Sequence, residues 1–71
     1  MKNCKAPNTL PSLRRRFPIG AVVTNFGIRA VVRDYMQHDD GTCDLLLAEV
    51  KADGRLSRSR WMADPYKCVR A

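Results

Sequence analysis

The stretch G-A-V-V-T-N-F-G-I-R-A-V-V-R-D-Y-M at residues 20–36 decides the fold, because it is typical of two strands joined by a tight turn at Asn25-Phe26-Gly27. Side chains alternate between the two faces of a strand. In residues 20–26, one face then carries Val22, Thr24 and Phe26, and the other Ala21, Val23 and Asn25. In residues 28–36, one face carries Ile28, Ala30, Val32 and Met36, and the other Arg29, Val31, Arg33 and Tyr35. The stretch therefore predicts a β-hairpin.

The rest of the chain continues this pattern of short β-prone runs between turns. Residues 38–41 (H-D-D-G) and 52–54 (A-D-G) end in Asp-Gly and each predicts a hairpin turn. Between them, residues 42–50 contain three consecutive leucines, which indicates a strand buried on both faces and central in the sheet. Residues 55–62 and 66–70 predict a fourth and a fifth strand. Five short strands in meander order are expected to curl into a barrel.

Two segments resemble the SH3-like small barrels, including their KOW and Tudor-like branches. They are Pro18-Ile19-Gly20-Ala21-Val22-Val23, followed by Gly27 and Ala30-Val31-Val32, and Trp61-Met62-Ala63-Asp64-Pro65, which looks like the single helical turn before the last barrel strand. The resemblance implies a five-stranded antiparallel barrel over residues 17–71. Ala30 stands where a typical KOW segment has glycine. With so few aromatic residues, we do not expect this chain to form the aromatic cage of methyl-lysine readers.

The segment before the barrel differs in composition. Residues 1–16 hold five basic and no acidic residues, two prolines, and only two leucines to bury. This composition predicts a flexible basic arm. Residues 11–16 could form a short helical turn with proline in its first turn, but Pro18 soon makes the chain extended, so the arm is favoured. A chain of 71 residues is one domain at most. Its longest apolar run, Leu45-Leu46-Leu47-Ala48, is too short to cross a membrane, and no export signal is visible, so we expect a cytoplasmic protein.

The net charge of +6 is concentrated at the two ends of the chain. Residues 17–50 hold two basic and five acidic residues, whereas residues 51–71 hold six basic and two acidic ones. Phosphate groups attract such cations, and one guanidinium group can bind two phosphate oxygens at once. The candidate phosphate-binding residues are Arg14, Arg15, Arg16, Arg55, Arg58, Arg60, Lys67 and Arg70. Alternatively, the arginines of residues 55–62 only solvate an edge strand.

Two aromatic residues near these arginines, Trp61 and Tyr66, are candidates for stacking on unpaired bases if they are exposed. A domain with so few aromatic residues also needs Trp61 for its core, and the core is the favoured location. Arg29, Arg33 and Tyr35 are expected on the surface, where Asp34, Asp44 and Glu49 are candidate cross-strand partners.

The sequence offers little for catalysis. Cys4, Cys43 and Cys68 form no metal-binding spacing, and Cys43 and Cys68 are expected in the core. His38 in Q-H-D-D-G is most simply part of a solvated turn, although a histidine beside carboxylates also suits acid–base or metal chemistry. No nucleotide-binding loop or Ser-His-Asp arrangement is present. We therefore expect no catalytic residues, no metal and no cofactor.

Three hypotheses for function remain open. The first is a small nucleic-acid-binding or ribonucleoprotein accessory module that contacts RNA or DNA through the basic arm and the arginines of the fourth strand. The second is an adaptor or inhibitor that docks on an acidic protein surface through a barrel edge or groove. The third, less favoured, is an enzyme that forms its active site by oligomerising around a pore, as in trimethoprim-resistant dihydrofolate reductases. Their Val-Gln-Ile-Tyr segment is replaced here by Ser57-Arg58-Ser59-Arg60. Oligomeric state is left open.

Overall fold

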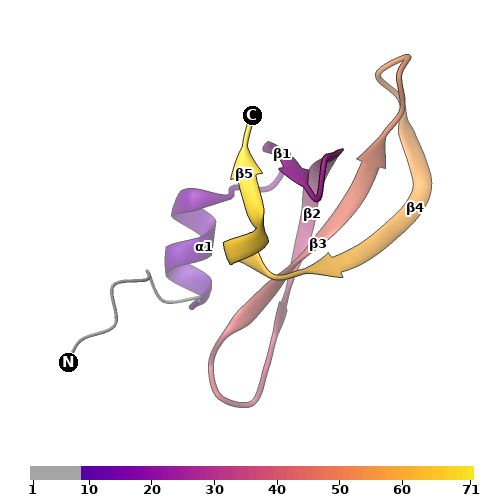
Figure 1. Cartoon of the computed structure of the whole chain (residues 1–71). Helices are drawn as coiled ribbons and strands as arrows, with labels where there is room; N and C mark the ends of the chain where they lie inside the picture. Colours follow the sequence, from indigo (N-terminus) through magenta and orange to yellow (C-terminus); the bar gives the residue numbers. More distant parts are fainter. Residues whose placement is uncertain (1–8) are drawn as a thin grey trace.

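The computed structural model of the chain describes residues 9–71 and consists of one antiparallel sheet with a short helix beside it (Figure 1). The predicted all-β class is confirmed. The elements are α1 (Leu10–Arg16), β1 (Val22–Asn25), β2 (Ile28–Gln37), β3 (Cys43–Val50), β4 (Leu56–Ala63), a 3-10 helix (Pro65–Lys67) and β5 (Cys68–Arg70). No helix within residues 9–71 is long and apolar enough to cross a membrane.

The three predicted turns all join neighbouring antiparallel strands. Phe26 and Gly27 connect β1 to β2, and the two Asp-Gly turns connect β2 to β3 and β3 to β4. In the second turn, Asp40 accepts hydrogen bonds from the backbone and the hydroxyl of Thr42, at 3.0 and 2.6 Å. In the third, Asp53 accepts one from the backbone of Arg55 at 3.0 Å. Local turn chemistry therefore fixes the hairpin positions.

The order of strands in the sheet is β4-β3-β2-β1-β5. The predicted meander holds for the first four strands, but β5 pairs with β1 instead of following β4. Residues 66–70 were expected to be one strand, whereas Pro65–Lys67 form a 3-10 helix and only Cys68–Arg70 are extended. Proline at the first position favours the helical turn, and the side chain of Asp64 accepts a hydrogen bond from the backbone of Tyr66 at 3.0 Å.

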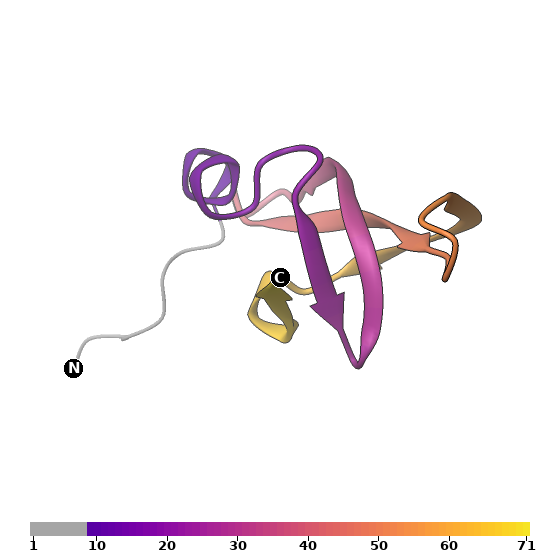
Figure 2. The ribbon, with the colours of Figure 1, turned by 90° about the horizontal axis from the view of Figure 1, so that it is seen from above.

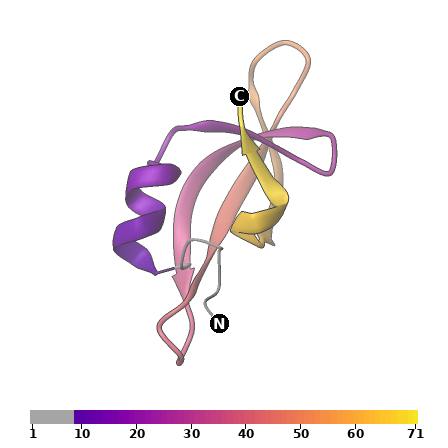
Figure 3. The same cartoon turned by 60° about the vertical axis from the view of Figure 1, so that its left-hand side comes forward.

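The core lies on one face of the sheet and is completed by α1. Its strand residues include Val23, Val32 and the leucines at 45 and 47, and Leu13 of α1 is as fully buried as they are. The two predicted core cysteines, Cys43 and Cys68, are buried free thiols. Figures 2 and 3 show α1 as a separate element alongside the sheet.

The prediction of a flexible arm over residues 1–16 is wrong for Leu10–Arg16. The helix has proline in its first turn, where no intrahelical hydrogen bond is lost, and it buries Leu13 in the core. A β-bridge between Thr9 and Thr42 holds the chain just before the helix. The part of the predicted arm at residues 1–8, with Lys2, Cys4 and Lys5, lies outside the described residues.

A bulge in β2 overturns the expected surface position of Tyr35. The register with β3 shifts between Val32 and Asp34, so that Arg33 has no partner and the following side chains change face. Tyr35 therefore packs against the core, and its hydroxyl donates to the carbonyl oxygen of Phe17 at 2.7 Å. Met36, expected on the same face as Val32, is exposed on the opposite face.

Candidate nucleic-acid interface

The arginines of this protein keep their charges largely unneutralised. All nine lie within residues 9–71, and in this part of the chain only Arg55 has a carboxylate within 4.0 Å, that of Asp53 at 3.9 Å. The expected cross-strand ion pairs of Arg29 and Arg33 with acidic neighbours are not formed. Guanidinium groups without carboxylate partners remain available to phosphate oxygens.

Four of these arginines belong to α1 and β5. Arg14, Arg15 and Arg16 form the last turn of α1, and Nη1 of Arg70 in β5 donates to the carbonyl oxygen of Arg16 at 2.9 Å. This contact satisfies a carbonyl that the end of a helix leaves free, and positive charge is favourable there. The guanidinium of Arg16 also lies over the ring of Phe17, 5.4 Å from its centre. We call Arg14, Arg15, Arg16 and Arg70 the α1–β5 basic group.

The arginines of β4 are not part of this group. Arg60 is opposite Ala48 of β3 and lies on β4, at one edge of the strand order. Arg70 lies on β5, at the other edge of the strand order, opposite Val23 of β1. Arg60 also alternates with Trp61, which faces the core, so Arg60 points away from the face that α1 covers. The predicted phosphate-binding arginines are therefore divided between the two outer strands of the sheet order, with α1 beside β5.

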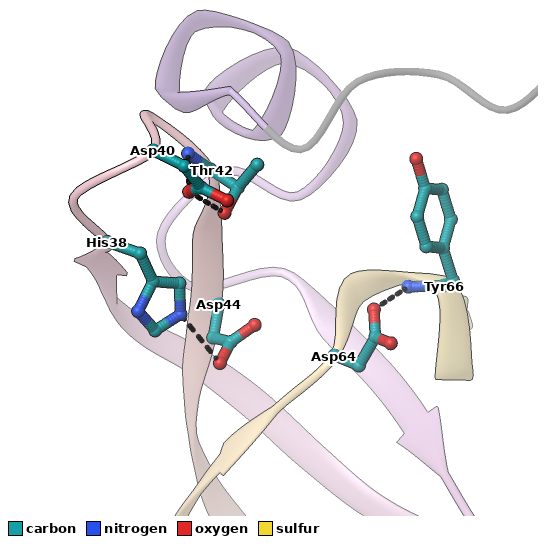
Figure 4. A network of polar contacts seen from close by, with 6 residues as sticks. All are labelled: His38, Asp40, Thr42, Asp44, Asp64 and Tyr66. Carbon is teal, nitrogen blue, oxygen red and sulfur yellow. Dashed lines mark hydrogen bonds and ion pairs between the residues drawn. The ribbon is translucent and has the colours of Figure 1, made fainter. Parts of the chain in front are cut away.

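Trp61 occupies the core position that the sequence favours. It packs half-buried against the core, and its indole N–H donates to Oδ1 of Asn25 at 3.0 Å. Asn25 is itself buried, and its Nδ2 donates to the carbonyl oxygen of Lys67 at 3.1 Å. Tyr66 is 38% exposed, and its ring points away from Asp64, whose carboxylate caps the 3-10 helix (Figure 4). Lys67, also exposed, ends that helix just before β5.

The most exposed large apolar side chain in the described part of the chain is one that the sequence reasoning passed over. Phe26 is 79% exposed and lies at the tip of the β1–β2 hairpin, with a positive φ of 51°. Strand alternation had placed it on a face with Val22 and Thr24. The available signal was the turn itself, because a two-residue hairpin turn favours asparagine, aspartate or glycine where this chain has phenylalanine.

Hydrogen bonds and burial affect several titratable groups near the hairpin turns and β5. Nε2 of His38 lies 3.1 Å from Oδ2 of Asp44 on the exposed β2–β3 end (Figure 4). Hydrogen bonds from Thr42 lower the pKa of Asp40. Burial raises the pKa of Cys68, against a smaller opposite effect of its hydrogen bond from Asn25. The described residues contain no group of three or more potential metal ligands and no enclosed pocket.

Comparison with known proteins adds no relative to these observations. No protein-family model, curated protein or solved structure gives a match. The candidate interface is therefore defined by the α1–β5 basic group, the separate arginines of β4, and the exposed phenylalanine at the β1–β2 turn.

Proposed function

We propose that this protein is a small nucleic-acid-binding module that contacts phosphate through the α1–β5 basic group. The observation that supports it best is the set of four arginines, none with a carboxylate partner within the described residues, brought to one place by the contact between Arg70 and Arg16. The net charge of +6 adds a long-range attraction to polyanions.

The fixed backbone distinguishes this cluster from a mobile basic tail. Leu13 anchors α1 in the core, so the last turn of the helix holds three guanidinium groups in a defined place. Arginines on a fixed helix lose less conformational freedom when they bind than arginines on a disordered segment.

The test compares two paired variants, Arg14→Ala/Arg15→Ala and Arg58→Ala/Arg60→Ala. All four side chains are exposed, and each pair removes two charges from a single element, α1 or β4. We expect fluorescence anisotropy with labelled oligonucleotides at 0.1 M salt to show a loss of about tenfold or more for the α1 pair, and less than about threefold for the β4 pair. Absence of binding by the unmodified protein at low salt would remove the proposal.

For the fold, we propose a partly open SH3-like barrel. The strand order β4-β3-β2-β1-β5 and the 3-10 turn just before β5 support this assignment. Asn25 adds a side-chain link across the open side, because it joins Trp61 of β4 to the junction of the 3-10 helix and β5. A nuclear Overhauser contact between the indole N–H of Trp61 and the side-chain amide of Asn25 is the expected signature in solution.

A protein-docking function is the second candidate, favoured by the position of β4. This eight-residue strand ends the strand order, so its outer edge has no partner strand within residues 9–71. An exposed edge can accept an added strand, and Arg58 and Arg60 favour an acidic one. A partner that stays bound after nuclease treatment, and is lost when Arg58 and Arg60 become glutamate, is the result expected for this function.

A further inference from the structure

Phe26 combines two unfavourable features that no contact within the described chain explains. Among residues 9–71 it is the one non-glycine residue with a positive φ, and it leaves 79% of its surface in water. A positive φ is costly for a bulky side chain, and asparagine or glycine would serve the turn better. Strain of this kind, kept together with an exposed aromatic ring, points to a role in recognition.

The surroundings of Phe26 are basic. Asn25, the residue before it, is opposite Cys68 in the β1–β5 register and holds the carbonyl of Lys67 through its side chain. The 3-10 helix with Lys67 thus lies next to the β1–β2 turn. From Lys67, β5 leads to Arg70 and the α1–β5 basic group, three residues further along or about 10 Å. One edge of the sheet therefore has an aromatic ring near one end and guanidinium groups at the other.

We propose that Phe26 is a base-stacking residue for single-stranded RNA or DNA, whose phosphates lie along β5 toward the α1–β5 basic group. This inference rests on the proposed function and adds to it the form of the nucleic acid. A duplex keeps its bases stacked on one another, so an aromatic ring next to cations gains contact only with unpaired bases. Stacking depends little on base identity, so the preference is for strandedness and not for sequence.

The test uses Phe26→Asn with three measurements. Asparagine suits the backbone of the turn, so we expect a thermal midpoint equal to or above that of the unmodified protein. Anisotropy with a labelled oligo-dT and an oligo-U of 12 nucleotides should show affinity reduced about tenfold, since one base–aromatic stack contributes of that order. Affinity for a duplex of the same length should change less than about twofold.

Two further variants separate stacking from a structural role. Phe26→Trp keeps an aromatic face and should restore single-strand affinity to within about twofold of the unmodified protein. Met36→Thr removes another exposed apolar side chain, 52% accessible at the opposite end of β2, and should leave binding unchanged.

The outcomes distinguish this inference from the proposed function. If Phe26→Asn binds single strands as tightly as the unmodified protein while Arg14→Ala/Arg15→Ala does not, stacking by Phe26 is refuted and phosphate binding stands. Equal losses for single strands and duplex would also overturn the stacking role. If the unmodified protein binds neither form, or binds only an acidic protein, both proposals fail.

Discussion

The buried side chain of Asn25 connects its own strand, β1, to β4 and to the 3-10 helix before β5. Its side chain accepts from the indole of Trp61 and donates to the carbonyl of Lys67, and Nδ2 also lies 3.7 Å from the thiol of Cys68. Removing it takes away the partner of the indole N–H of half-buried Trp61 and of the carbonyl of Lys67, and an orphaned group shielded from water costs about 1–3 kcal/mol. We expect Asn25→Ala to lower the free energy of unfolding by about 2–4 kcal/mol in urea titrations. Thr24→Ala, on the opposite face of β1, should cost less than about 1 kcal/mol, and an equal loss would contradict the special role of Asn25.

Tyr35 makes the free energy of unfolding depend on pH in the alkaline range. Partial burial raises its pKa above the ordinary 10.0, although the guanidinium of Arg14 works in the opposite direction and Asp34 adds a smaller increase. Since the unfolded chain loses this proton first, the contribution of Tyr35 is complete below pH 10.0 and is lost as the pH rises through the folded-state pKa. We expect Tyr35→Phe to be about 1 kcal/mol less stable at pH 7, because the carbonyl of Phe17 loses its donor. The difference in urea midpoint between the two proteins should be smaller at pH 11 than at pH 7. A difference that grows at high pH would contradict this assignment.

At the scale of elements, α1 depends on the sheet for its existence. A helix of seven residues is unstable by itself, and this one has no side-chain cap at its start. Leu13, fully buried, is its main attachment to the core. We expect Leu13→Ala to cost about 2–4 kcal/mol of stability and to weaken nucleic-acid binding together with it, since the arginines lose their fixed positions. The matched control is Leu56→Ala on β4, where 42% exposure predicts a cost below about 1 kcal/mol in the same urea titration. Unchanged stability of Leu13→Ala would show that α1 does not need this anchor.

The elements also show where sequence reasoning succeeds and fails. Strand alternation and Asp-Gly turns are local signals, so the hairpins could be placed from the residues alone. The bulge at Arg33 and the pairing of β5 with β1 depend on distant contacts, and neither has a local signal. An arm was preferred to a helical turn at residues 11–16 for a related reason: a single buried leucine stabilises the helix only once the core exists. Of the candidate site, the basic residue types were visible in sequence, but their division between the two outer strands of the sheet was not.

Over the whole molecule, the separation of charges decides which arginines act together. The β4 arginines and Arg70 lie on the two outer strands of the order β4-β3-β2-β1-β5, which are four strand spacings apart, or about 19 Å measured across the sheet. At physiological salt the screening length is about 8 Å, so the β4 arginines contribute little to the potential at the α1–β5 basic group. Near 0.01 M salt the screening length grows to about 30 Å, and the arginines of both outer strands attract a polyanion together.

This separation predicts a particular salt dependence of binding. Each phosphate contact to a single strand contributes about 0.7 to the slope of log affinity against log salt concentration, because binding releases counterions. Removing Arg14 and Arg15 should therefore reduce the magnitude of the slope by about 1.4 between 0.1 and 0.3 M salt. Removing Arg58 and Arg60 takes the same charge from the molecule, yet should leave the slope unchanged in that range. If both double variants lower it equally, net charge alone governs binding, and the assignment of phosphate contacts to the α1–β5 basic group is wrong.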